Sequence, residues 1–285
     1  MVTGLTYAST GGVRLCIRDR GRGPTVVLLH GTSANLGVWD RVVEMLGSDV
    51  RTVAVDQRGH GRSDKPPAGY GASEFADDVA GLVRTLACAP AIIVGHSLGA
   101  RNAVVAAARH PELVAGVVAV DYTPYVEPEV LDDLQARVEA GNRAFAGRDE
   151  LVSYLRGRYP LIADDAVERR ADYGYGPADP GLRPLASPEA LTQAVAGLRA
   201  DFVDDVVAVG VPVTVIRGEL SRIVSAEAMA RTRSLRPDFR VVQLPDVDHY
   251  VPEERPDVVA HEIRRLLDQR QASAAVSTEA GNPAA

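Results

Sequence analysis

The sequence predicts an α/β fold with a mostly parallel sheet, and two patterns carry that prediction. Short apolar runs rich in β-branched residues alternate with stretches of helical periodicity, which is the rhythm of parallel strands joined by helices. One of these runs ends in a glycine-rich turn that opens a further helix. The hydrophobic fraction of 46 % over 285 residues is ample for a core around such a sheet.

This alternation of predicted strands and helices continues up to Val120. We expect strands at Val13–Arg18, Thr25–Leu29, Arg51–Val55, Ala91–Val94 and Val114–Val120. We expect helices at Trp39–Leu46, at Ser73–Leu86 with Ser73 as the N-cap, and at Leu98–Arg109. Strands that return through helices run parallel, so helices should cover both faces of the sheet.

The rhythm breaks after Val120, because residues 122–200 contain no clear buried strand. This segment shows helical stretches at Glu129–Phe145 and Asp149–Arg158, and a loop rich in glycine and proline at Tyr173–Pro188. The alternation resumes with a strand at Val213–Arg217, a helix at Ala226–Leu235, a strand at Arg240–Leu244 and a helix at Val258–Arg270. We therefore predict a core of residues 1–121 and 201–270, a helical cap of residues 122–200 and a disordered tail of residues 271–285.

Composition and charge narrow the classes of function. Lysine plus arginine number 31 and aspartate plus glutamate 38, which gives a net charge of −7 and argues against a general nucleic-acid binder. The two cysteines, Cys16 and Cys88, are too few for a disulfide scaffold or a multi-cysteine zinc module. No secretory signal or membrane-length apolar run is visible, so we expect a cytoplasmic protein that does not bind membranes.

No motif in the chain calls for a cofactor or a metal. His261-Glu262 lacks the second histidine that a zinc-binding helix needs, and no phosphate loop or dinucleotide fingerprint is present. The expected partner is therefore a small-molecule substrate alone, and a homodimer remains open.

The strongest chemical signal is Gly95-His96-Ser97-Leu98-Gly99, which follows an apolar strand and opens an Ala/Val-rich helix. This is the context of a nucleophile elbow, where flanking glycines allow a tight turn and the helix N-terminus favours negative charge. The alternative is a glycine-rich strand–helix turn with an incidental serine. Because motif and context agree, we predict Ser97 as a nucleophile.

A serine nucleophile needs a base, and His249 is the best of six histidines. It stands in a loop after the last predicted strand, where α/β sheets place their sites. His96 lies inside the elbow, and we expect its ring to face away from the nucleophile. A surface-loop role for His249 is the alternative.

Together these pieces resemble the α/β-hydrolase fold, in which an eight-stranded, mostly parallel sheet carries a helical cap. The matching segments are His30-Gly31, Asp56 to Ser63, Gly95–Gly99 and Asp248-His249, and they span residues 25 to 250. The resemblance implies an oxyanion hole made by the backbone N–H groups of Thr32 and Leu98. We expect the turn at residues 59–63 to be structural.

The acid of the triad departs from the commonest pattern of that family. The expected position, three residues after Gly218, holds Ser221, which cannot carry a negative charge. Asp121, at the end of the strand before the insertion, is the favoured replacement, because some family members keep their acid there. Glu219 is the second choice, and a site without an acid is the third.

The expected reaction is hydrolysis of a carboxylic ester or lactone through an acyl-enzyme on Ser97, with His249 as base and Asp121 as its orienting acid. Aromatic residues of the cap and of the site loops suit a medium-sized, partly apolar substrate. The candidate substrate-binding residues are Trp39, Tyr122, Tyr125, Tyr154 and Tyr250. Three alternatives stay open: a carbon–carbon bond hydrolase, a cofactor-free oxygenase and a non-catalytic small-molecule receptor.

Overall fold

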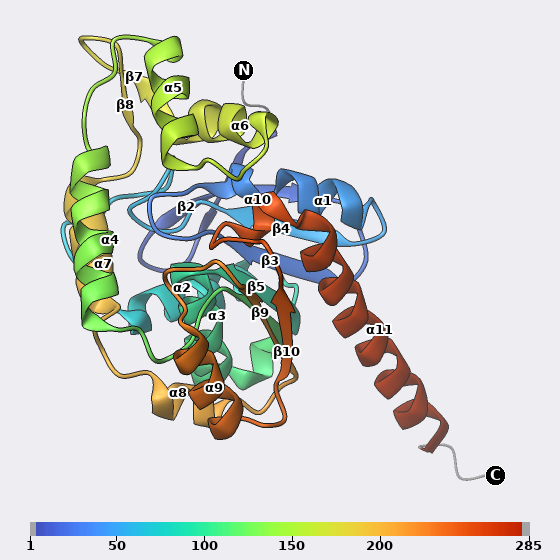
Figure 1. The fold of residues 1–285 in the computed structure, drawn as a ribbon. Coiled ribbons are helices and arrows are strands. Elements are labelled where there is room, and N and C mark those ends of the chain that lie inside the picture. The colour runs from blue at the N-terminus through green and yellow to red at the C-terminus, as the bar shows by residue number, and fades with distance from the viewer. Residues whose placement is uncertain (1–3, 281–285) are drawn as a thin grey trace.

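The computed structural model describes residues 4–280, and an eight-stranded sheet organises them. Figure 1 shows this sheet at the centre of the molecule, with the cap to one side of it. The strands lie in the order β1-β2-β4-β3-β5-β6-β9-β10. Their bounds are Thr6–Ser9 (β1), Arg14–Arg20 (β2), Thr25–Leu29 (β3), Arg51–Val55 (β4), Ala91–His96 (β5), Val114–Val120 (β6), Val213–Gly218 (β9) and Arg240–Leu244 (β10).

Six of the eight strands, from β4 to β10 along the sheet, pair in parallel, and only β2 pairs antiparallel with β1 and β4. The carboxyl ends of β3, β5, β6, β9 and β10 therefore share one edge, which is where a parallel sheet places its site. The predicted fold class is confirmed. Strand β1 was not predicted, because its four residues, Thr6–Ser9, alternate too briefly to stand out.

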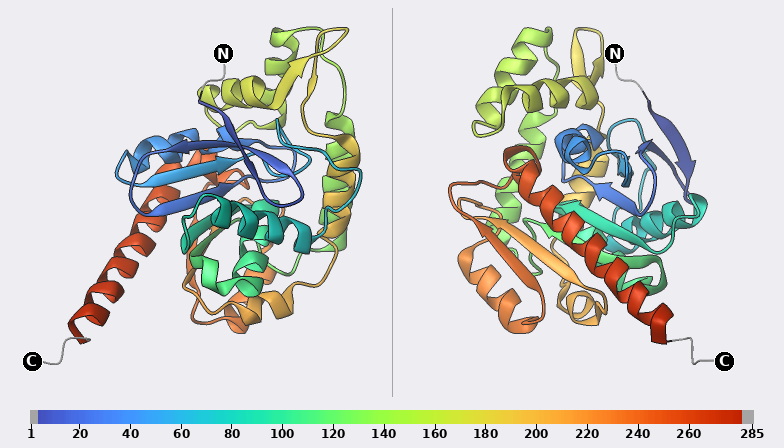
Figure 2. Two further views of the ribbon diagram at one scale, coloured as in Figure 1. Left: turned by 180° about the vertical axis from the view of Figure 1, so that it is seen from behind. Right: turned by 90° about the vertical axis from the view of Figure 1, so that its right-hand side faces the viewer.

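Helices cover both faces of the sheet, as the two further views show (Figure 2). The helices of the core are η1 (Leu36–Trp39), α1 (Asp40–Leu46), α2 (Ala72–Thr85), α3 (Leu98–Arg109), η2 (Pro111–Leu113), α8 (Val203–Ala208), α9 (Ala226–Leu235), α10 (Val251–Glu254) and α11 (Pro256–Ala280). Apolar residues of α1 and α11 share one buried cluster with the sheet, and those of α2, α3, α8 and α9 share another.

The segment between β6 and β9 carries most of the remaining elements. They are α4 (Pro128–Gly141), α5 (Arg148–Arg158), α6 (Asp164–Gly174), α7 (Pro188–Gly197) and a hairpin of β7 (Tyr175–Pro177) and β8 (Leu182–Pro184). Helices α4 and α7 pack side by side, whereas α5, α6 and the hairpin lie together farther out (Figure 1). The hairpin lies within the segment Tyr173–Pro188, which the sequence predicts as a loop. Gly181, at φ +75°, provides the left-handed conformation in the turn that joins the two strands.

Helix α6 is the part of this segment that is most firmly attached to the core. The buried guanidinium of Arg170 forms a two-pronged ion pair with the carboxylate of Glu253 in α10. Arg18 of β2 donates to the hydroxyl of Tyr173 at 2.6 Å and also pairs with Asp40. A buried, bidentate pair of this kind fixes orientation more than it adds stability.

Several predicted boundaries differ from the structure. The helical stretch predicted at Glu129–Phe145 ends early, because α4 stops at Gly141 and Phe145 pairs with Leu182 instead. Helix α2 begins at Ala72 with Gly71 as the N-cap, because the Ser73 hydroxyl bonds to Glu74 and does not cap the helix. The predicted disordered tail is helical over residues 271–280, which extend α11. Alanine, frequent in that stretch, has the highest helix propensity of any residue, so no apolar period is needed. Residues 281–285 lie outside the described residues. Among the described helices none is long and apolar enough to cross a membrane.

Candidate active site

Ser97 sits on the sharp turn between β5 and α3 that the sequence predicts. Its backbone lies at φ +53° and ψ −117°, a region that non-glycine residues rarely adopt. The turn is held from the sheet side, because the Ser97 N–H donates to the Val120 carbonyl at 2.9 Å. The side chain therefore stands at the carboxyl edge of the sheet, in the strained conformation typical of an elbow.

The flanking glycines are required by close backbone contacts. A Cβ on Gly95 would lie 2.0 Å from the Gly99 carbonyl oxygen, and a Cβ on Gly99 would lie 2.2 Å from the Leu29 carbonyl oxygen. No side chain could relieve either overlap, since both partners are backbone. The pattern in the sequence thus follows from the geometry of the turn.

His249 and Asp121 meet at this edge. His249 Nδ1 donates to Asp121 Oδ2 at 2.6 Å, and Asp121 is fully buried. With Nδ1 protonated, the neutral ring offers Nε2 as a base, and Ser97 and His249 line one cavity. No hydrogen bond between Ser97 Oγ and that ring is found within residues 4–280, a contact that serine hydrolases often tighten only when substrate binds.

Ser221, the residue at the usual acid position, bonds to Asp121, the predicted acid. Its hydroxyl donates to Asp121 Oδ2 at 2.5 Å, and the Gly218 N–H donates to Asp121 Oδ1 at 3.1 Å. The same hydroxyl accepts N–H groups of Ile223 and Val224, both at 3.2 Å. Ser221 therefore ties Asp121 to the loop after β9. The side chain of Glu219 is exposed, whereas Asp121 bonds directly to the His249 ring, so geometry favours Asp121 over Glu219.

The predicted oxyanion donors lie beside the nucleophile. Leu98 is the first residue of α3, so its N–H has no acceptor within the helix. Thr32 follows the His30-Gly31 pair and lines the same cavity as Ser97. A Cβ on Gly31 would lie 3.2 Å from Ser97 Cβ, which shows how closely this loop approaches the elbow. Two backbone donors can thus face one point near Ser97.

His96 does not face away from the site as expected. Its Nε2 lies 2.8 Å from the His249 carbonyl oxygen, and the two rings are 4.6 Å apart. The ring lines the catalytic cavity, because the elbow turns its side chain toward the loop that carries His249. Burial lowers the pKa of His96 well below the usual value, so the ring is neutral. Its one proton is on Nε2, because the His249 carbonyl oxygen can only accept a hydrogen bond.

The loops behind the site are held by other neutral histidines. His30 Nε2 accepts from the Gln57 N–H at 3.1 Å, and burial lowers the pKa of His30 to about 4. His60 is also fully buried, and burial lowers its pKa to about 3. Asp56, which precedes the turn at residues 59–63, accepts the N–H group of Arg62 in that turn at 2.9 Å and the N–H group of Leu36 at 2.8 Å. These contacts support the structural role predicted for that turn.

Two of the five predicted substrate-binding residues lie near the site. Tyr250 lines the catalytic cavity, and Tyr154 lines the chamber next to it. Trp39 packs into the core beneath α1, and Tyr122 packs into the core on the opposite face. Tyr125 lies under the guanidinium of Arg231, at 3.8 Å, in a separate surface pocket. None of these three lines the cavity that holds Ser97: Trp39 and Tyr122 are buried in the core, where aromatic side chains pack well, and Tyr125 lines a different pocket.

Sequence reasoning missed the arginines of the cavity wall. Arg137, Arg158 and Arg170 all line the catalytic cavity together with Tyr159. Arg170 is neutralised by Glu253, but no carboxylate within residues 4–280 forms a salt bridge with Arg137 or Arg158. Both arginines belong to helices of the insertion, and an arginine on such a helix is normally expected to face solvent. Arg158 and Tyr159, at the end of α5, are adjacent in sequence and both line the cavity, but nothing in the sequence alone distinguishes them from exposed residues.

Tyrosines orient these two arginines. Arg158 donates to the hydroxyls of Tyr154 and Tyr159 at 2.9 and 3.1 Å, and to the Arg137 carbonyl oxygen at 3.0 Å. Arg137 donates to the Tyr250 hydroxyl at 2.9 Å. Burial raises the pKa of Tyr250 to about 12, so that hydroxyl stays neutral. Two cations without a carboxylate partner thus line the cavity that Ser97 and His249 share.

Comparison with known proteins agrees with this arrangement. A family model described as the alpha/beta hydrolase fold matches residues 24–256. A 2-(acetamidomethylene)succinate hydrolase of Mesorhizobium japonicum is 50% identical over 258 residues, covering 90% of this chain and 93% of the relative. An esterase of Mycobacterium tuberculosis is 28% identical over 266 residues, covering 91% and 88%.

A solved structure of E-2-(acetamidomethylene)succinate hydrolase superposes with a TM-score of 0.90 at 49% identity, covering 93% of this chain and 98% of that one. The fold, the strand-edge constellation and these relatives together support a hydrolase. The chain belongs to the α/β-hydrolase-fold family.

Proposed function

We propose that this protein hydrolyses the amide bond between an acyl group and the nitrogen of a small dicarboxylate. The observation that carries the proposal is the pair of arginines, Arg137 and Arg158, in the wall of the cavity that holds Ser97 and His249. The similar hydrolase is named for 2-(acetamidomethylene)succinate, which has two carboxylates and one acetamide. Both features of such a molecule have a counterpart in this cavity.

The arginines match the charges of the dicarboxylate. A guanidinium binds a carboxylate through charge-assisted hydrogen bonds, worth about 1.5–3 kcal/mol each when water is excluded. Arg137 and Arg158 have tyrosine and backbone partners but no carboxylate partner within residues 4–280. An anionic substrate would supply the missing countercharge.

The reaction follows a double displacement. Ser97 Oγ attacks the acyl carbonyl carbon while His249 Nε2 accepts its proton, and the oxyanion lies against the N–H groups of Thr32 and Leu98. The carbon–nitrogen bond then breaks as His249 returns that proton to the nitrogen. Water, deprotonated by His249, attacks the acyl-enzyme and releases the acid. Asp121 stabilises the imidazolium throughout.

Cleavage of an ester or lactone is the second candidate. The same acyl-enzyme route serves an oxygen leaving group, and a relative of 28% identity is an esterase. It is placed second because the relative of 50% identity is named for an acetamide substrate, whereas the esterase is only 28% identical. The carbon–carbon hydrolase, oxygenase and receptor lack a comparable observation. Cofactor independence, a cytoplasmic location and a homodimer stay predictions.

Acetate release tests the proposal. The purified protein is incubated with 2-(acetamidomethylene)succinate and, separately, with the matching dicarboxamide, which keeps the acetamide but removes both charges. We expect kcat/KM to favour the dicarboxylate at least 100-fold, as loss of about 3 kcal/mol of charge-assisted contact implies. Equal turnover of the two would overturn carboxylate recognition. Acetate release from esters alone would select the second candidate.

A further inference from the structure

The carbonyl group of His249 cannot find a hydrogen-bond donor in the turn of chain that follows it. A carbonyl at such a place accepts the N–H of the third or fourth residue further on. The third residue is Pro252, in the first turn of α10, and proline has no N–H. The fourth is Glu253, whose N–H donates to the Tyr250 carbonyl at 2.9 Å. The His249 carbonyl therefore depends on a donor from another part of the chain.

The imidazole of His96 is that donor. Its Nε2 lies 2.8 Å from the His249 carbonyl oxygen, and the centroids of the two rings are 4.6 Å apart. His96 is only 3% exposed, so water does not compete for this hydrogen bond. Because Ser97 is the next residue in the chain, a side chain of the elbow connects the loop of the base to the nucleophile.

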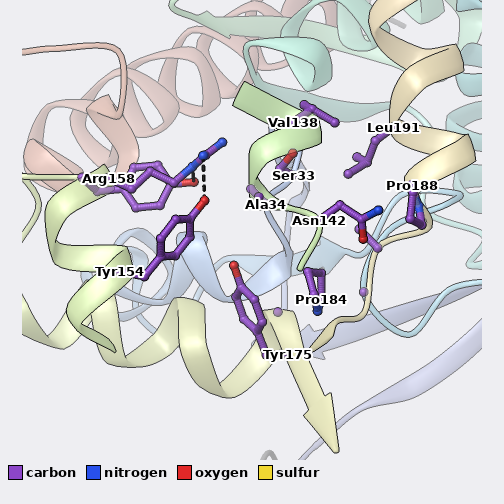
Figure 3. Close-up of a pocket in the computed structure, with 15 residues that line it drawn as sticks. Ser33, Ala34, Val138, Asn142, Tyr154, Arg158, Tyr175, Pro184, Pro188 and Leu191 are labelled. Atoms are coloured by element: carbon purple, nitrogen blue, oxygen red, sulfur yellow. Dashed lines mark hydrogen bonds between the residues drawn. The ribbon is translucent and has the colours of Figure 1, made fainter. Parts of the chain in front are cut away.

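Another edge of the same ring packs against the loop of the predicted oxyanion donors. A Cβ on Gly31 would lie 2.9 Å from His96 Nδ1, so a larger residue there would displace the ring. The loop is less confined beyond Gly31, because Ser33 and Ala34 line both the catalytic cavity and the chamber beside it (Figure 3). Ser33 also lies at φ +59°, a strained conformation that the surroundings must hold. The His96 ring thus lies between the loops of residues 31–34 and His249.

An uncharged donor suits this position. Burial, together with the neighbouring His249, Arg170 and His30, holds the pKa of His96 well below its usual value. When His249 accepts the proton of Ser97 it becomes a cation, and a second cation 4.6 Å away would oppose that step. A neutral imidazole holds the loop without this repulsion.

We propose that His96 is a positioning residue, which places His249 for proton transfer with Ser97 by donating to the His249 carbonyl oxygen. The inference rests on the proposed function for the roles of Ser97 and His249, but not for the identity of the substrate. It gives the elbow a second task, since the residue before the nucleophile fixes the base.

Two substitutions of equal length separate the hydrogen bond from packing. His96→Gln keeps an N–H donor at the same number of bonds from the backbone as Nε2, whereas His96→Met has the same length and no donor. A fluorophosphonate, which needs a serine activated by its base, labels Ser97 without any carboxylate contact. Labelling should slow about 100-fold in His96→Met, as a misplaced base implies, and stay within about fivefold in His96→Gln.

His60→Met is the matched control, because His60 is also a buried histidine but does not line the catalytic cavity. It should lower the thermal midpoint and leave labelling within about twofold of the unaltered protein. His96→Leu, also without a donor, repeats the test with different packing. Equal slowing in His96→Met and His96→Gln, or labelling that follows the thermal midpoint in every variant, would overturn the proposal.

Turnover of the dicarboxylate distinguishes this inference from the proposed function. In His96→Met, kcat should fall while KM changes less than about threefold, because the arginines of the wall are unaltered. Unchanged labelling and kcat in that variant would overturn the positioning role alone. Labelling that falls in His96→Met and recovers in His96→Gln, with no turnover of the dicarboxylate by any variant, would overturn the proposed function alone. Neither labelling nor turnover in the unaltered protein would overturn both.

Discussion

The two walls of the catalytic cavity are built in different ways. On the sheet side, Ser97 and Asp121 follow strand ends and are fixed by backbone hydrogen bonds to the neighbouring strand, at 2.9 Å to Val120 and 2.7 Å to Ile216. On the cap side, Arg137 and Arg158 reach the cavity from helices and are oriented by tyrosine hydroxyls. A backbone-fixed wall suits bond-making, and a wall of long side chains suits recognition.

The largest expected effect comes from the nucleophile on the sheet side. Ser97→Ala removes the atom that forms the acyl-enzyme in the proposed reaction, so kcat should fall by about 10⁶. Circular dichroism and the thermal midpoint should stay close to those of the unaltered protein, because the backbone of the elbow is held by its glycines. Turnover that survives in this variant would place the chemistry elsewhere.

The next effect distinguishes the acid. Asp121→Asn keeps the size of the side chain but fixes His249 in the wrong tautomer, so kcat should fall by about 10⁴. Glu219→Gln is the matched control and should change kcat less than twofold, since its side chain is exposed. A larger loss in Glu219→Gln than in Asp121→Asn would reverse the assignment.

The cap side should respond through KM. Arg137→Gln and Arg158→Gln each remove charge-assisted contact with a carboxylate, so KM for the dicarboxylate should rise about 10- to 100-fold while kcat changes little. Arg156→Gln, on the same helix as Arg158 but exposed and paired with Asp164, is the control and should leave KM unchanged. Loss of kcat at constant KM would give these arginines a role in the chemistry instead.

Ser221 should give a smaller effect on the sheet side. Ser221→Ala removes one hydrogen bond from Asp121 while Gly218 and His249 remain its partners, so kcat should fall about fivefold, as loss of about 1 kcal/mol implies. Ser221→Thr, which retains the hydroxyl, should recover most of that rate. Failure of threonine to recover it would mean that packing, and not the hydrogen bond, is what Asp121 needs.

Acid should weaken the sheet side through its buried histidines. The folded-state pKa values of His30 and His60 lie at about 4 and 3, below the usual 6.5, so the unfolded chain binds more protons as pH falls. Stability from each neutral ring is complete above pH 6.5 and is lost toward its folded pKa, at up to about 1.4 kcal/mol per pH unit.

Urea unfolding between pH 7 and 5 measures that slope. His60→Gln should flatten it even if the variant is less stable overall, while His261→Gln, at an exposed position, should leave it unchanged. An equal slope in the unaltered protein and His60→Gln would exclude the buried ring as its source.

The sequence was informative where backbone geometry constrains residue type. Gly95 and Gly99 are demanded by contacts of 2.0 and 2.2 Å, so the elbow could be recognised from spacing alone. Asp121 could be proposed because Ser221 occupies the usual acid position and because members of the resembled family can keep their acid at the end of this strand. The strand and helix pattern of the core was predictable for the same reason, since burial on a sheet imposes its own periodicity.

The cap was less predictable because the polar residues of its helices can face either the cavity or the solvent. An arginine that lines a cavity and one that faces only water look alike in sequence, so the exposed Arg137 and the partly buried Arg158 could not be separated from Arg156. Trp39 was predicted to bind substrate but lies in the core, because a large aromatic side chain packs equally well in a core and in a pocket. Which residues of the cap face the cavity is decided by tertiary packing, and the local sequence does not show it.

Calorimetric titration of the Ser97→Ala variant tests the central claim most directly, because it separates recognition by the cap from chemistry at the strand edge. We predict that this variant binds 2-(acetamidomethylene)succinate without consuming it, binds the dicarboxamide at least 100-fold more weakly, and loses the difference when Arg137→Gln and Arg158→Gln are both added. Equal affinity for the two compounds, or continued release of acetate, would contradict the account.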